Sequence, residues 1–130
     1  MIYSLAVYGS PYTHQSSDSA YQFARELLTQ GHEIYRIFFY HDGVYNASPL
    51  PAPPQDEINI AARWSVFAAD NDIELVVCVA SAIRRGILDD AESRRYEKDT
   101  HNIEQHFTIS GLGQLIDAGI ASDRMITFGS

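Results

Sequence analysis

Short apolar runs alternate along the chain with longer segments in which apolar residues recur every three or four positions. The short runs are rich in β-branched and aromatic residues, which is typical of buried strands. Five strands are predicted in this way, at residues 2–7, 33–40, 73–77, 107–109 and 124–128. Strands that alternate with helices favour parallel pairing through right-handed crossovers. We therefore predict a single α/β domain over residues 1–130, with a mainly parallel open sheet of about five strands and helices on both faces.

Polar side chains mark the expected starts of the later helices. Asp56 and Glu57 suit the first turn of a helix that carries Trp64 on its apolar face. Asp89 and Glu92 have the spacing of a capping box. Ser110 is the expected cap of the last helix. That helix has on one side the apolar residues Leu112, Leu115, Ile116 and Ile120.

Composition and charge narrow the classes of function. The chain is 45% hydrophobic with a formal net charge of −8, which indicates an ordered globular domain. Because the nucleic-acid backbone requires a basic surface, direct nucleic-acid binding is excluded. No apolar run is long enough to span a membrane, and no basic region precedes the first strand. We therefore expect a cytoplasmic protein that does not contact membranes.

The only cysteine, Cys78, directly follows the apolar strand at residues 73–77. Ala80 and Ser81 then open a helix, with Ser81 as its candidate cap, and Gly86 ends it. In a parallel sheet this places the thiol at the carboxyl edge, where such sheets bind ligands, and beside N–H groups that favour an anion. A thiolate there is a candidate nucleophile. The alternative is a buried cysteine that only fills space in the core.

Other residues could assist the thiolate. His14 and His41 each follow one of the first two strands, on the same edge as Cys78, although solvated loop residues are the simpler explanation for both. Arg84 and Arg85 could add positive charge, or instead form salt bridges between subunits. The Cys-x5-Arg spacing from Cys78 to Arg84 also occurs in phosphatases and arsenate reductases, but here the intervening loop has no glycine.

Signals for a bound cofactor or metal are missing from the sequence. The first turn lacks the dinucleotide-binding glycine pattern, and no phosphate-binding loop sequence occurs. The five histidines do not have metal-ligand spacing. We therefore expect neither a cofactor nor a metal. Tyrosines in or beside loops on the predicted active edge favour a protein partner there; they are Tyr8, Tyr12, Tyr40 and Tyr45.

The chain resembles the DsrE/TusD family of small sulfur-transfer proteins over nearly its whole length. No single motif carries the resemblance, but together the motifs are specific. They are residues 19–24 (SAYQFA), 31–33 (GHE), 38–40 (FFY), 42–44 (DGV), 78–80 (CVA), 84–86 (RRG) and 110–115 (SGLGQL).

The resemblance implies a sulfurtransferase whose Cys78 carries a persulfide. It also implies a cytoplasmic hetero-hexamer of paired heterotrimers, built with two related small subunits, and a sulfur-accepting partner of the TusE/DsrC type. TusD-type members serve tRNA 2-thiouridine synthesis, which is the destination we expect, and DsrE-type members serve intracellular sulfur oxidation, which is the alternative. A Cys-x5-Arg phosphatase or reductase and a non-catalytic interaction subunit are further alternatives.

Overall fold

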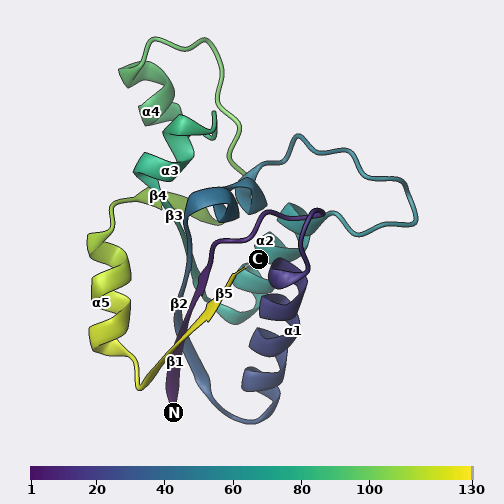
Figure 1. The fold of residues 1–130 in the computed structure, drawn as a ribbon, viewed down its shortest axis with the longest axis vertical. Helices are drawn as coiled ribbons and strands as arrows, with labels where there is room; N and C mark the ends of the chain where they lie inside the picture. The colour runs from purple at the N-terminus through teal and green to yellow at the C-terminus, as the bar shows by residue number, and fades with distance from the viewer. Residues whose placement is uncertain (130) are drawn as a thin grey trace.

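The computed structural model describes residues 1–129, which contain one five-stranded sheet in which every pairing is parallel. The spatial order is β4-β3-β2-β1-β5 (Figure 1). The first strand therefore lies next to one edge of the sheet, and the last strand forms that edge. The strands are β1 (Ile2–Val7), β2 (Glu33–Phe39), β3 (Glu74–Cys78), β4 (Phe107–Ser110) and β5 (Arg124–Phe128). The predicted α/β fold with a parallel sheet of about five strands is confirmed.

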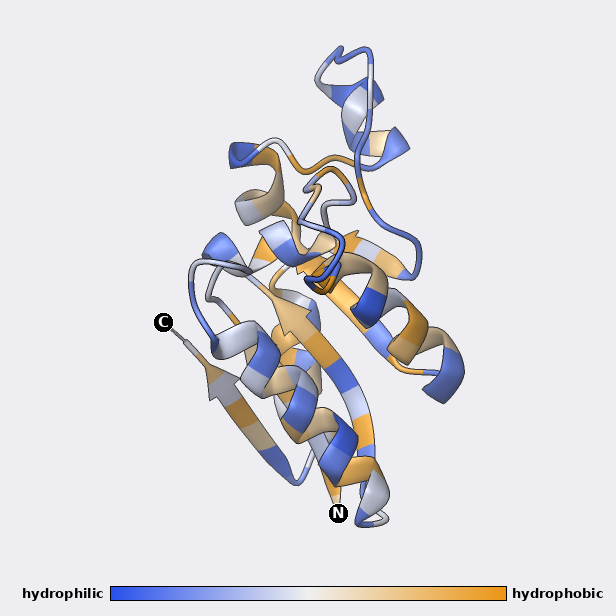
Figure 2. Cartoon of the chain, turned by 90° about the vertical axis from the view of Figure 1, so that its right-hand side faces the viewer, coloured by the Kyte–Doolittle hydropathy of each residue, from blue (hydrophilic) through white to orange (hydrophobic). Residues whose placement is uncertain are grey.

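The helices cover the two faces of this sheet unequally. They are α1 (Ser16–Thr29), α2 (Ile60–Asn71), α3 (Val79–Arg84), α4 (Asp90–Arg95) and α5 (Gly113–Ala121), with a 3₁₀ segment η1 (His41–Ala47). The helices α1 and α2 lie on one face and α5 lies alone on the other, while α3 and η1 sit at the carboxyl edge (Figure 1). The segment that carries α4 projects from the body and is largely hydrophilic (Figure 2).

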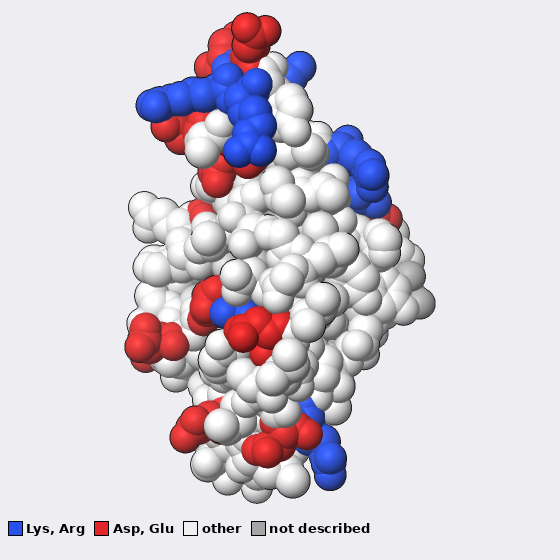
Figure 3. Space-filling model, turned by 90° about the vertical axis from the view of Figure 1, so that its left-hand side faces the viewer, with Lys and Arg blue, Asp and Glu red and all other residues white. Residues whose placement is uncertain are grey.

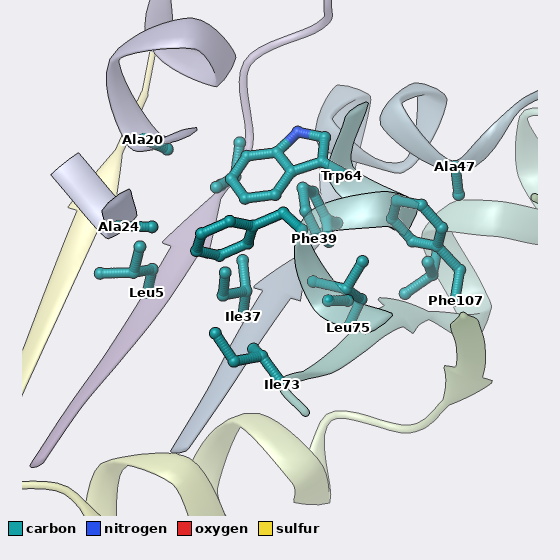
Figure 4. Close-up of a cluster of buried hydrophobic side chains, with 14 of the residues drawn as sticks. Leu5, Ala20, Ala24, Ile37, Phe39, Ala47, Trp64, Ile73, Leu75 and Phe107 are labelled. Atoms are coloured by element: carbon teal, nitrogen blue, oxygen red, sulfur yellow. The ribbon is translucent and has the colours of Figure 1, made fainter. Parts of the chain in front are cut away.

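The main core lies between the sheet and the α1/α2 layer. Trp64 and Phe39 are fully buried at its centre, with ring centroids 5.4 Å apart in an edge-on arrangement (Figure 4). The indole N–H of Trp64 donates to Ser17 Oγ, so its one polar group is satisfied. Deleting a buried aromatic side chain costs about 3–5 kcal/mol, so this cluster contributes strongly to stability.

A polar anchor attaches α5 to the opposite face. Arg36 on β2 is buried and bonds to Asp117 at 2.9 Å, to Glu74 at 3.1 Å and to the carbonyl of Gln114 at 2.7 Å. The hydroxyl of Tyr35 also donates to Asp117. These contacts, first the Tyr35 hydrogen bond and then Arg36, hold the pKa of Asp117 below its ordinary value.

The outer side of α5 remains uncovered. Ala118 is buried and Leu115 half-buried against the sheet, while three apolar residues of the stripe noted in the sequence face outwards. They are Leu112, Ile116 and Ile120, which are 55%, 65% and 81% exposed. Their spacing of four residues places them in one row along the helix.

Three of the predicted helix starts were wrong. The second helix begins at Ile60, beyond Asp56 and Glu57, because the Asn59 side chain caps it by accepting the N–H of Ala62. Ser110 belongs to β4, where it lies opposite Cys78, so α5 starts only at Gly113. Ser81 is inside α3 and does not cap it.

Two other helix boundaries were predicted correctly. Asp89 accepts the N–H of Glu92 at 2.8 Å and caps α4, as half of the expected capping box. Gly86 follows the end of α3 with a positive φ of 75°, a conformation that glycine adopts without steric cost. The second strand ends at Phe39, one residue before its predicted end, because Tyr40 already leads into η1.

Candidate active site around the single cysteine

Cys78 is the last residue of β3 and immediately precedes the first residue of α3. Its backbone is extended, with φ −62° and ψ 123°, so the chain changes from strand to helix in one step. The side chain is 3% exposed and belongs to a small apolar cluster with Phe38 and Val76, on the α5 face of the sheet. Tyr40 and Leu115 pack against this cluster. The thiol is therefore at the predicted edge but beneath a cover of side chains.

Tyr40 connects this cover to the surrounding loops. Its ring lies 5.5 Å from that of Tyr8, 6.1 Å from that of Phe38 and 4.9 Å from the imidazole of His41, measured between centroids. Burial, and then the neighbouring Tyr8, raise the pKa of Tyr40 above its ordinary value. Tyr40 is therefore a neutral hydroxyl group at physiological pH.

Two polar contacts fix α3 to η1. The buried Ser81 Oγ accepts the backbone N–H of His41 at 2.9 Å. Arg85 donates from Nε to Asp42 Oδ1 at 2.8 Å and also to the carbonyl of Ser81. Both side chains therefore hold η1 against α3, the helix that follows Cys78. Arg85 therefore forms its salt bridge within the chain, with Asp42, whereas the sequence suggested either a free positive charge or a salt bridge between subunits.

The remaining candidates lie at different distances from the cluster around Cys78. Ala80 is exposed in the first turn of α3, and His41 stacks on Tyr40. Arg84 is exposed at the other end of α3. His14 lines a separate cavity beside Asp18 at the start of α1, so the structure does not bring it to the cysteine.

The Cys-x5-Arg spacing does not form a phosphate cradle here. Residues 79–84 are helical, and at 1.5 Å per residue Arg84 is about 9 Å further along the axis than Cys78. A cradle instead requires the loop to wrap so that its N–H groups and the guanidinium converge on one anion. This geometry argues against the phosphatase alternative. In residues 1–129 no group of three or more His, Cys, Asp or Glu side chains is arranged to hold a metal ion.

Sequence reasoning placed Tyr40 on the active edge but missed that Phe38 and Leu115 pack around the thiol with it. Phe38 and Val76 lie opposite each other in the β2–β3 register, and Phe38 and Tyr40, like Val76 and Cys78, are two residues apart. A period of two places such residues on the same face of a sheet, so this signal was present. Leu115 comes from a helix elsewhere in the chain, and no local pattern links it to Cys78.

Comparison with known proteins agrees with this architecture. The model of the DsrE/DsrF-like family matches residues 1–128. A putative sulfurtransferase DsrE from Allochromatium vinosum is 53% identical over 129 residues, 99% of each chain. Sulfurtransferase TusD from Salmonella dublin is 42% identical over 128 residues, 98% of this chain and all of the relative. The crystal structure of the ychN protein from E. coli shares the fold with a TM-score of 0.79 at 19% identity, and covers 98% of this chain and 99% of its own.

The chain belongs to the DsrE/DsrF-like family. The expected enzyme class, a sulfurtransferase, is confirmed by the names of its relatives. No helix among residues 1–129 is long and apolar enough to cross a bilayer.

Proposed function

We propose that this chain is a sulfur-carrier subunit of a cytoplasmic sulfur relay, and that Cys78 holds the sulfur as a persulfide. The observation that carries the proposal is that the only thiol in a sulfurtransferase-family chain lies at the carboxyl edge of the sheet, between β3 and α3. With no second thiol in the chain, a persulfide on Cys78 has no internal partner that could displace it.

The transfer consists of two displacements at sulfur. The Cys78 thiolate attacks the terminal sulfur of a donor persulfide, the donor S–S bond breaks, and the donor leaves as a thiolate. A thiolate on an acceptor protein of the TusE/DsrC type then attacks the terminal sulfur on Cys78. The acceptor gains the sulfur and its proton, and Cys78 leaves as a thiolate. Sulfur is passed on without net oxidation, so no cofactor is required.

The sulfur has two candidate destinations. The first is tRNA 2-thiouridine synthesis, as in TusD-type relays, and the second is intracellular sulfur oxidation, as in DsrE-type relays. The identity of 53% to the relative named DsrE, against 42% to that named TusD, favours the second. Expression in a bacterium that lacks its own TusD decides between them. Restored 2-thiouridine in tRNA, lost again in Cys78→Ser, supports the first destination, and no restoration supports the second.

The carrier chemistry is tested directly on the purified chain. Incubation with a persulfide donor, followed by intact-mass measurement without reductant, should add sulfur to the wild type and none to Cys78→Ser. Serine is close to cysteine in size, so the variant should keep the fold, which circular dichroism checks. Equal sulfur uptake by both chains would place the sulfur elsewhere and refute the proposal.

We also propose that the chain works in a hetero-hexamer with two related small subunits. The support for this is the exposed apolar row formed by Leu112, Ile116 and Ile120. Charged side chains cover only part of the face that carries α5 (Figure 3), and an exposed apolar patch of this kind marks a site of protein interaction. Ile116→Asp should prevent co-purification with the related subunits. Val66→Asp, at a 59% exposed position on α2, is the matched control and should leave the assembly intact. Assembly that survives Ile116→Asp would exclude this face.

A further inference from the structure

A groove lies between the end of α3 and the chain segments that flank α4 on either side. Its volume is about 550 Å³, and it is lined by Ile83, Arg84, Gly86, Leu88, Tyr96 and Lys98. The lining combines the apolar side chains of Ile83 and Leu88 with two cations, Arg84 and Lys98. We call it the Arg84–Lys98 groove. None of these residues is part of the cluster around Cys78.

The two cations of the groove differ from their basic neighbours in having no partner. Arg84 and Lys98 are exposed, and neither forms an ion pair within residues 1–129. By contrast Arg85, Arg94 and Arg95 are each paired with a carboxylate. In a chain of net charge −8, two unpaired cations in one groove form a local positive site that an acidic partner would complement.

The groove is close to the sulfur site along the same helix. Arg84 ends α3, which starts directly after Cys78, so the two are separated by about 9 Å of helix axis. An extended peptide advances about 3.3 Å per residue. A peptide with a thiol at Cys78 would therefore reach the level of Arg84 along the helix axis with the side chain about three residues away.

We propose that the Arg84–Lys98 groove binds an acidic segment of the protein that accepts sulfur from Cys78. The segment carries a carboxylate about three residues from its thiol, and an apolar side chain between them packs on Leu88 and Tyr96. This inference rests on the proposed function, since it assigns the acceptor's docking surface. Ion pairing with two exposed cations gives selectivity for the acceptor and modest affinity.

Binding is tested first, without any sulfur chemistry. The probe is a four-residue capped peptide, Ser-Ala-Leu-Glu, added to isotope-labelled protein and followed by amide NMR shifts. The reversed sequence, Glu-Leu-Ala-Ser, covers the opposite chain direction. For at least one of them we expect shifts at residues 83–88 and 96–98, and smaller shifts with glutamine in place of glutamate. The double variant Arg84→Gln/Lys98→Gln should give the same shifts with the glutamate and glutamine peptides. Arg94→Gln, which removes a cation outside the groove, should preserve the difference between the two peptides.

Transfer is tested second, with cysteine in place of serine in the peptides. Cys78 is converted to its mixed disulfide with 2-thiopyridine, and the peptide thiolate displaces thiopyridone, whose release gives the rate. The glutamate peptide should react about fivefold faster than the glutamine peptide, and the double variant should lose this preference. If glutamate and glutamine peptides give the same NMR shifts, the inference is wrong. Persulfide loading of Cys78 is measured separately, so that result leaves the proposed function standing.

Discussion

The cover over Cys78 should control how fast the thiol reacts. At 3% exposure the sulfur meets a reagent only when a covering side chain moves, and Leu115 is the one that comes from a separate helix. We predict that Leu115→Ala accelerates labelling of Cys78 by iodoacetamide in the folded protein. The reason is that truncation makes this local opening easier.

The size of the effect follows from the buried area that Leu115 contributes. Burying a CH₂ group contributes about 0.8 kcal/mol, and Leu115 is only partly buried, so losing its isopropyl group costs about 1–2 kcal/mol. If the opening that exposes Cys78 undocks Leu115, its free energy falls by the same amount. Labelling should then be about tenfold faster.

Two controls separate local opening from global unfolding. Ile116→Ala alters the same helix at a 65% exposed position and should leave the labelling rate of Cys78 unchanged. Ile34→Val lowers global stability by about 0.5–1.5 kcal/mol from the other face of the sheet. Equal acceleration by Leu115→Ala and Ile34→Val would show that labelling requires global unfolding, and would refute the reasoning. So would a Leu115→Ala rate equal to that of the wild type.

Two further predictions concern stability. The pKa of Asp117 lies below the usual 3.8 because the Tyr35 hydroxyl donates to its carboxylate. The ionised carboxylate therefore stabilises the fold above pH 3.8, and this contribution is lost as the pH falls through the lower pKa of the folded state. Urea unfolding of Asp117→Asn should therefore depend less on pH below about pH 4 than that of the wild type; an unchanged dependence would contradict this. Gly43→Ala should lower the urea midpoint sharply, because a Cβ there would lie 2.1 Å from the carbonyl oxygen of Val7. Gly119→Ala, at an open helical position, should instead raise the free energy of unfolding by about 0.5–1 kcal/mol and so raise the urea midpoint, and the opposite order would refute both.

The sheet was predictable from sequence because its central strands contain dense apolar runs. Leu75, Val76 and Val77 are fully buried from both sides, and a dense β-branched run has few alternatives to a central parallel strand. The position of Cys78 at the end of such a strand followed directly. The last helix was less predictable, since an apolar row normally faces the core. Here Arg36, far away in sequence, binds Asp117 and Gln114 and turns Ile116 outwards.

The partners of the candidate residues were not predictable for the same physical reason. Whether Arg85 is free depends on Asp42, and whether Ser81 caps a helix depends on the N–H of His41. Each of these contacts joins residues about 40 positions apart. Local spacing identifies a residue's chemical type and its edge of the sheet, but only tertiary packing decides which atom it binds.

The burial of Cys78 has a consequence for the fidelity of sulfur delivery. Cells contain abundant small thiols, and any of them could attack the inner sulfur of an open persulfide, form a mixed disulfide with the cysteine and release the terminal sulfur as sulfide. If Cys78 carries the proposed persulfide, its burial beneath Tyr40 and Leu115 would shield that persulfide kinetically from such thiols, because random collision does not hold the cover open. A protein acceptor can displace the cover with binding energy gained elsewhere on the surface. Sulfur would thus leave this chain only when a specific acceptor protein is bound to it.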